Sequence, residues 1–366
     1  MKIAHRLRTV KFSSAPASIT SFSGLRFVLQ LAQRLGLVRD LQTLTVKKRR
    51  RGIPIEDFVL SLASSFLVGG DSLSDLSVLR EETVTRALCD DLEVPAPTTA
   101  GERLRTFTLG HLHQLGGVQG RFVRSVLERR GGSGPMTIDV DSSIFEVHGY
   151  LKEGARYGYT GVRGLHPLLA FVHEERLLLG CRLRAGNRTS ADGAISFLSE
   201  VLRSVPPGRS VRLRMDAGFY NREVACFCEK RALGFSISAR LTKRLQAAIS
   251  ALPEEAWKLY PWEEDAQWVE LKYQPQGWTR AYRLLVKRTP WYEKEQLVLG
   301  KHFHTALITS LSGAGPSLIR YHLARGGAEN YIEEFKNGVG AVHLPSQRFG
   351  ANAAWLQMAA LAYNLA

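Results

Sequence analysis

Carboxylates stand at three places in this 366-residue sequence where neither a strand nor a helix needs them for packing. In "TIDVDSS", Asp139 and Asp141 are two residues apart, so an extended strand directs both side chains to one face. In "RLRMDAGF", Asp216 ends an expected strand, and in "YHLARGGAENYIEEFK" an expected helix carries Glu329. A few carboxylates that leave positions open for a substrate phosphate are typical of a Mg²⁺ or Mn²⁺ site.

Four polar side chains of the last segment share one stripe of the expected helix. At about 100° per residue, with the first at 0°, the others fall at roughly 40°, 80° and 60°. They are Tyr321, Arg325, Glu329 and Lys336. Glu333 lies beside the stripe, and Glu334 points away from it. The angular positions therefore exclude Glu334 and leave Glu329 and Glu333.

Each of these features also has a simpler explanation. Asp139 or Asp141 can end a strand, Asp216 can be a turn residue, and the helix charges can form a solvated face. Taken singly, the simpler explanations are favoured. Taken together, strand-end carboxylates and a charged helix stripe indicate a divalent metal site on a basic protein.

The charge balance predicts a polyanionic partner. Lys and Arg number 49 against 34 acidic residues, which gives a net charge of +15 and a pI near 9.9. Nucleic acid is the first candidate and an acidic membrane surface the second. No apolar run reaches the roughly 18 residues of a spanning helix, and no signal peptide is apparent, so we expect a cytoplasmic protein without a membrane partner. The four cysteines show no zinc spacing and are expected to be buried thiols.

The pattern predicts an α/β protein with a helical region at residues 1–130. Within that region, a run of five basic residues either grips DNA phosphates or forms a solvated helix end. The run consists of Lys47, Lys48, Arg49, Arg50 and Arg51. Residues 131–242 give three strands, a helix with Ser190 as its cap, a strand, a helix and a strand. Residues 243–310 read as a β-rich insertion that holds five of the six tryptophans, and residues 311–366 as two helices.

The combination of these motifs resembles the DDE transposases of bacterial insertion sequences. Tyr321, Arg325, Glu329 and Lys336 match the Tyr-Arg-Glu-Lys signature of insertion-sequence family four and its relatives, with one extra residue between the Tyr and the Arg. The stretches "DVDSSIFEVHG", "EGARYGYTGVRGLHPLLAF", "MDAGFY" and "GANAAWLQMAALAYNL" resemble insertion-sequence family 1380 in particular. The resemblance implies a ribonuclease-H-like (retroviral-integrase-like) catalytic core, preceded by a helical DNA-binding region.

The resemblance also implies roles for individual residues. It selects Asp141, followed by Ser142-Ser143, over the alternative Asp139, and it assigns Asp216 and Glu329 as the other two catalytic metal ligands. Two Mg²⁺ or Mn²⁺ ions would be held there. Arg325 and Lys336 would contact DNA phosphates, and Tyr321 would hydrogen-bond to a terminal phosphate.

The expected function is the binding of transposon ends, their cleavage and their joining to target DNA. The partners would be double-stranded DNA with terminal inverted repeats, target DNA and a second copy of the chain on paired ends, near the bacterial nucleoid. Two alternatives are a non-catalytic DNA-binding descendant and a hydrolytic ribonuclease-H-like nuclease. The pair Gly326-Gly327 costs about 1 kcal/mol per glycine in a helix, and close passage of DNA would explain it.

Overall fold

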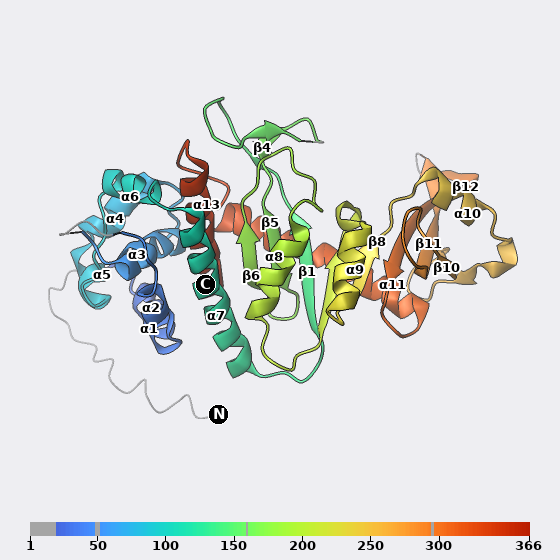
Figure 1. The fold of residues 1–366 in the computed structure, drawn as a ribbon, viewed down its shortest axis with the longest axis horizontal. Coiled ribbons are helices and arrows are strands. Elements are labelled where there is room, and N and C mark those ends of the chain that lie inside the picture. Colours follow the sequence, from blue (N-terminus) through green and yellow to red (C-terminus); the bar gives the residue numbers. More distant parts are fainter. Residues whose placement is uncertain (1–19, 48–51, 159, 294–295) are drawn as a thin grey trace.

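The structure is a computed structural model that describes residues 20–47, 52–158, 160–293 and 296–366 (Figure 1). It is a mixed α/β fold built on one large, mostly antiparallel sheet of nine strands. Helices lie at one end of the sheet and on both of its faces, and a small three-stranded sheet lies beyond its upper edge in Figure 1.

The described residues between 20 and 130 form helices and connecting turns. The long α7 begins where the Thr108 hydroxyl accepts a hydrogen bond from the His111 amide at 3.4 Å, and it ends at Gly131, whose φ is +69°. The helices are α1 (Gly24–Arg34), α2 (Leu37–Leu41), α3 (Ile55–Leu67), α4 (Leu76–Glu81), α5 (Thr83–Leu88), α6 (Pro97–Leu104) and α7 (Leu109–Arg130), with a 3₁₀ turn at Leu73–Asp75.

Five strands form the centre of the molecule, in the order β6-β5-β1-β7-β8. Strand β1 pairs in parallel with β7 and antiparallel with β5, while β7–β8 is parallel and β5–β6 antiparallel. Their apolar residues are almost all buried, as expected for strands covered on both faces. The strands are β1 (Met136–Ser142), β5 (Leu168–Val172), β6 (Leu177–Arg182), β7 (Val211–Met215) and β8 (Gly234–Ser238).

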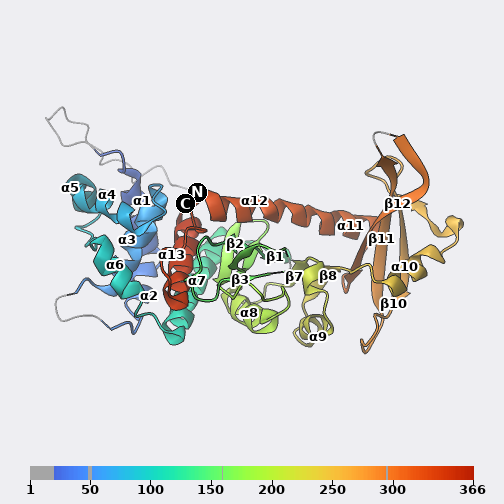
Figure 2. The same ribbon diagram turned by 90° about the horizontal axis from the view of Figure 1, so that it is seen from above.

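Helices cover both faces of these strands, as Figure 2 shows. The segment of α11 (Gly315–Leu323) and α12 (Gly327–Glu333) crosses one face at a steep angle to the strands, while α8 (Ala194–Val201) and α9 (Arg222–Lys230) lie on the other. The buried α13 (Phe349–Leu365) joins the sheet to the helical region, where Trp355 meets Phe66 with ring centroids 4.6 Å apart. Because helices cover both faces, β1 and β7 are held in place, and with them the strand ends that carry Asp141 and Asp216.

The insertion begins with a helix and then extends the same sheet. Its strands pair antiparallel with one another, and β12 pairs with β8 through Leu307–Ser238, so the β-rich segment is continuous with the central sheet. Trp257 is buried there, whereas Trp262 and Trp291 are each 45% exposed. The elements are α10 (Lys243–Ser250), β9 (Lys258–Leu259), β10 (Gln267–Tyr273), β11 (Tyr282–Glu293) and β12 (Gln296–Thr309), with a 3₁₀ turn at Glu254–Ala256.

Four local predictions differ from the structure. The sequence predicts three strands before the first helix of residues 131–242, but the small three-stranded sheet adds three more. Ser190 does not cap α8, because a turn intervenes and the helix starts after Gly193, whose φ is +72°. The segment predicted as one regular helix contains a 3₁₀ turn at Ala324–Gly326 and ends in a π-helical segment at Glu334–Gly338. Only Cys181 and Cys228 are buried, and the other two thiols are partly exposed.

None of the helices in the described ranges is both long enough and apolar enough to cross a membrane.

Candidate active site

Asp141 and Asp216 lie at the ends of two adjacent parallel strands. The last paired residues of β1 and β7 are Val140 and Met215. Asp141 directly follows Val140, and Asp216 directly follows Met215. The two carboxylates are close enough that the charge of Asp216 helps to raise the pKa of Asp141. The predicted pair of strand-end aspartates is therefore brought together at one edge of the sheet.

Asp141 lies in a partly buried, charged environment. Its Oδ2 accepts a hydrogen bond from Arg325 Nη1 at 2.7 Å, and its Oδ1 accepts one from the Ser142 amide at 2.8 Å. Burial raises the pKa of the Asp141 carboxyl most, the Arg325 guanidinium opposes that shift, and Asp216 adds to it. A cation at this edge would relieve the repulsion between the two aspartates, so this donor set fits a hard divalent metal ion.

Asp216 starts a tight 3₁₀ turn at Ala217–Phe219. Its Oδ1 accepts a hydrogen bond from the Gly218 amide at 3.0 Å. A Cβ at Gly218 would lie 2.4 Å from Ser190 Oγ, so glycine is needed for this approach. The hydroxyls of Ser190 and Ser142 are 2.8 Å apart, so Ser190 links the two aspartate-bearing turns instead of capping a helix.

The alternative ligand Asp139 has a different environment. Its side chain is fully buried and accepts two hydrogen bonds from Arg214, at 2.7 and 2.8 Å. His173 Nδ1 lies 3.0 Å from Oδ2 of the same carboxylate. These contacts occupy both oxygens of Asp139, so the geometry favours Asp141 as the residue open to a metal ion.

Glu329 is exposed on α12, about one helical turn beyond Arg325. In the described residues, no three His, Cys, Asp or Glu side chains are gathered closely enough to hold a metal ion, so Glu329 does not close a site with the two aspartates here. The 3₁₀ turn between Arg325 and Glu329 breaks the uniform angle per residue on which the predicted stripe depends. The catalytic role of Glu329 stays a prediction.

The other predicted DNA contacts lie apart from the aspartates. Tyr321 donates a hydrogen bond from its hydroxyl to Thr137 Oγ1 at 3.3 Å, and the Arg214 guanidinium lies 4.9 Å from its ring centroid. Thr137 is near the start of β1, so this hydroxyl is directed away from the end that carries Asp141. Lys336 is partly exposed in the π-helical segment. The DNA contacts of Tyr321 and Lys336 stay predictions.

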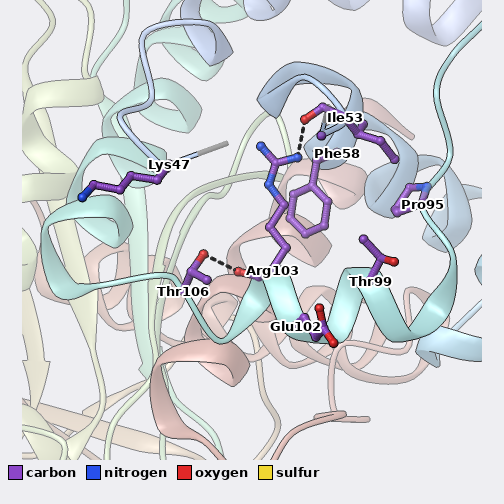
Figure 3. A pocket seen from close by; sticks show the side chains of 9 residues that line it. Lys47, Ile53, Phe58, Pro95, Thr99, Glu102, Arg103 and Thr106 are labelled. Carbon is purple, nitrogen blue, oxygen red and sulfur yellow. Dashed lines mark hydrogen bonds between the residues drawn. The ribbon is translucent and has the colours of Figure 1, made fainter. Parts of the chain in front are cut away.

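Of the basic run, Lys47 is described and exposed, while Lys48, Arg49, Arg50 and Arg51 lie outside the described residues. Lys47 lines a small pocket of about 110 Å³ in the helical region (Figure 3). Arg103 crosses that pocket, donates to the Ile53 carbonyl at 2.6 Å and lies 4.7 Å from the Phe58 ring centroid. Arg103 therefore stabilises the helical region, and the DNA contact of the run stays a prediction.

Sequence reasoning missed the buried polar groups under the helix. Arg214 joins Asp139 to the Tyr321 carbonyl, to which it donates at 2.6 Å. His322 is buried between the hydroxyls of Ser236 and Ser238, at 2.6 and 2.8 Å. Arg214 lies between Leu213 and Met215 in a strand with a second arginine, Arg212, and an arginine so close to buried apolar residues was a visible signal for a buried ion pair. Its partner followed only from the register of β1 and β7, which places Asp139 opposite Arg214.

Adjacent strand-end aspartates at the edge of an α/β sheet, in a basic protein, define a candidate site for phosphoryl transfer on nucleic acid. The family model described as "Transposase DDE domain group 1" matches residues 4–366, and the chain belongs to this family. It is therefore a DNA transposase, an enzyme that cleaves DNA and transfers strands. DDE domains generally use divalent metal ions.

Comparison with curated proteins gave no match. Among solved structures, the chain is similar to the piggyBac transposase in a synaptic complex with hairpin DNA, with 12% identity and a TM-score of 0.47 over 93% of this chain and 73% of that one. It is also similar to the Mos1 transposase in a paired-end complex with the left transposon end, with 13% identity and a TM-score of 0.21 over 59% and 78% of the two chains. No conclusion about function rests on scores of this size.

Proposed function

We propose that the protein is an insertion-sequence transposase similar to family 1380, with Asp141, Asp216 and Glu329 as its catalytic residues. The observation that carries this proposal is the pairing of β1 and β7, which sets Asp141 beside Asp216. The strand order β6-β5-β1-β7-β8, in which only β5 runs antiparallel to the other four, supports a ribonuclease-H-like core.

The two aspartates, together with Glu329, would hold two Mg²⁺ or Mn²⁺ ions. When bound, such ions activate the attacking water or 3′-hydroxyl and stabilise the leaving oxygen of an in-line displacement at phosphorus. Ser142 and Gly218 orient the two aspartates through their backbone amides. Arg325, beside Asp141, is placed to balance negative charge, first on the carboxylate and then on a DNA phosphate.

The substrates in this proposal are duplex DNA with terminal inverted repeats and, in the joining step, target DNA. The net charge of +15 supports this and a location at the bacterial nucleoid, in the cytoplasm. The helical region and its basic run would bind the transposon end. A homodimer would hold two ends together.

A cleavage assay tests the assignment. The protein is incubated with Mg²⁺ or Mn²⁺ and DNA that carries the inverted repeats flanking its gene. We expect strand cleavage at the repeat ends that Asp141→Asn, Asp216→Asn and Glu329→Gln each reduce at least a hundredfold. Glu333→Gln is the matched control, because Glu333 is an exposed carboxylate on the same helix. Cleavage that survives Asp216→Asn would show that the aspartate assignment is wrong.

A further inference from the structure

A small arm stands at the end of β1 and is not part of the carboxylate site. It comprises residues 143–158 and 160–165 and contains β2 (Phe145–Glu146), β3 (Arg156–Tyr157) and β4 (Arg163–Leu165), paired in the order β2-β4-β3. Figure 1 shows it above the upper edge of the sheet. The arm starts two residues after Asp141, so DNA with a phosphate at the aspartates lies next to it.

The loop that connects β2 and β3, which we call the tip of the arm, exposes two large apolar side chains in succession. Tyr150 is 84% exposed and Leu151 is 74% exposed. Their backbone is nevertheless held, because the Arg163 guanidinium donates to the carbonyls of Gly149 and Tyr150 and lies 5.4 Å from the Tyr150 ring centroid. An apolar tip that is both exposed and fixed in place is suited to contact a partner.

The base of the arm is packed backbone against backbone. A Cβ at Gly186 would lie 2.0 Å from the Gly164 carbonyl oxygen, and a Cβ at Gly164 would lie 2.4 Å from that of Phe145. An isolated bridge between Leu165 and Ala185 joins the arm to the loop that leads to Ser190. The arm is therefore fixed relative to the turn of Asp216, since Ser190 contacts that turn.

A cavity of about 460 Å³ lies at this base, and its charged lining consists of three arginines, Arg182, Arg184 and Arg188, and one carboxylate, Asp192. Arg184 is only 7% exposed and donates to three backbone carbonyls, those of His166, Thr189 and Asp192. Among the residues that the structure describes, no carboxylate forms an ion pair with Arg184 or Arg188, whereas Arg182 pairs with Glu200 at 2.6 Å.

Burial lowers the pKa of Arg184 to about 10; the Asp192 carboxylate opposes this shift, while the neighbouring Arg182 and Arg188 add to it. The group nevertheless remains a cation at neutral pH. Since Arg182 pairs with Glu200, the charges of Arg184 and Arg188 face the single carboxylate of Asp192, and the cavity keeps a net positive charge that is complementary to an anion. Gly154 also lines the cavity and is three residues from Leu151, so the tip lies within roughly 10 Å of it, about three base-pair steps of duplex DNA.

We propose that the arm and this cavity together bind the duplex beside the bond that is cut: Arg188, backed by Arg184, contacts a backbone phosphate, and Tyr150 with Leu151 enters the adjoining base step. Apolar side chains used in this way unstack a step and bend the duplex, while aromatic rings stack on the exposed bases. The inference rests on the proposed position of the scissile phosphate at Asp141 and Asp216.

The insertion of Tyr150 and Leu151 into a base step is tested by fluorescence. Metal is left out, so that the DNA stays uncut. End DNA carries 2-aminopurine at successive positions across the cleavage junction, and binding by the wild-type protein is expected to raise the emission at one step severalfold. Tyr150→Ser combined with Leu151→Ser should abolish this rise and weaken binding roughly 5- to 150-fold, the loss expected for one stacked base. Leu259→Ser is the control, since Leu259 is 76% exposed in β9, outside the arm and the helical region.

The phosphate contact is tested by salt dependence. Arg188→Gln should reduce the slope of log affinity against log salt by about 0.9, the value for one phosphate contact. Arg231→Gln at the end of α9, also exposed, should leave the slope unchanged. An unchanged slope in Arg188→Gln, or an unchanged fluorescence rise in the double variant, overturns the proposal.

Two further outcomes separate this inference from the proposed function. If the wild-type protein shows the fluorescence rise but leaves end DNA uncut in Mg²⁺, the catalytic assignment fails and the arm's contact stands. If the double variant instead dissociates a dimer in analytical ultracentrifugation while its DNA fluorescence is unchanged, the tip contacts a second copy of the chain and the DNA proposal is wrong.

Discussion

Arg325 Nη1 donates to Asp141 Oδ2 at 2.7 Å, with both side chains less than one-fifth exposed. The guanidinium therefore occupies one oxygen of the carboxylate that is expected to hold a metal ion. A cation that binds Asp141 must compete with Arg325, and the charge of Arg325 also repels it. The metal affinity of the site therefore depends on whether Arg325 is bound to Asp141.

Replacement of Arg325 by Ala should strengthen the binding of Mn²⁺ to the DNA-free protein. We expect an increase on the order of tenfold at pH 8, which corresponds to about 1.4 kcal/mol. Arg325→Lys should retain most of the wild-type behaviour, and Arg320→Ala in the preceding helix α11 should have no effect, because Arg320 is exposed and lies over the Trp262 ring. Electron paramagnetic resonance of free Mn²⁺ measures the affinity. Equal affinities of Arg325→Ala and the wild type would refute the competition.

Asp139 and Asp141 should respond in opposite ways to the same substitution. Asp139→Asn leaves Arg214, which is 1% exposed, without its anionic partner, and should destabilise the protein by about 3–5 kcal/mol. Asp141→Asn should abolish DNA cleavage with a much smaller loss of stability. Denaturant unfolding and the cleavage assay are compared for both variants. A stable but inactive Asp139→Asn protein would reverse the assignment.

The two aspartates illustrate what the sequence could predict. Alternation along β1 placed Asp139 and Asp141 on one face, and the structure has them there, together with Thr137 under the crossing helix. The burial of Asp139 depends on strand order, because Arg214 becomes its neighbour only when β1 and β7 pair in parallel. Alternation within one strand contains no information about that pairing.

The helix shows a second limit. Its charged stripe was derived from one constant rotation per residue, but the 3₁₀ turn at Ala324–Gly326 and the π-helical segment at Glu334–Gly338 change that rotation on either side of Glu329. Contacts such as Arg325–Asp141 and His322–Ser236 are set by how the helix lies on the sheet. Local periodicity cannot encode that tertiary relationship.

His322 should make the stability of the protein sensitive to acid. Burial, reinforced by Arg325 and Arg214, lowers the pKa of His322 to about 3, whereas an unfolded histidine titrates near 6.5. Below pH 6.5 the unfolded chain therefore binds a proton that the folded chain does not, and stability falls with decreasing pH. One such group contributes at most about 1.4 kcal/mol per pH unit.

The measurement is the free energy of unfolding between pH 6.5 and 5. His322→Gln should have a smaller pH dependence, although its stability at pH 7 is lower because contacts to two serines change. The rest of the dependence is assigned to His166, His302 and His304, whose pKa values burial also lowers. His148→Gln, at an exposed position, should retain the wild-type slope. An undiminished slope in His322→Gln would contradict this explanation.

Gly326 and Gly327 are not required by the fold. Both have right-handed helical dihedrals, with φ of −52° and −62°. A Cβ at Gly326 meets no atom within 4 Å, and one at Gly327 lies 3.7 Å from His173, an ordinary contact. Alanine at each position should therefore stabilise the protein, by up to about 1 kcal/mol. By contrast, a Cβ at Gly315 would lie 2.2 Å from the Trp268 ring, so Gly315→Ala should destabilise it.

Since folding does not explain the two glycines, passage of DNA over this part of the helix remains the prediction to test. If a DNA backbone approaches there, Gly326→Ala, whose Cβ points into open space, should raise the melting temperature and at the same time weaken the binding of end DNA. Gly327→Ala, whose Cβ contacts His173, should stabilise the protein with a smaller effect on DNA. Thermal unfolding and DNA-binding isotherms on the same samples separate the two effects. A Gly326→Ala protein that is more stable and binds end DNA as the wild type does would show that DNA does not pass close to this helix.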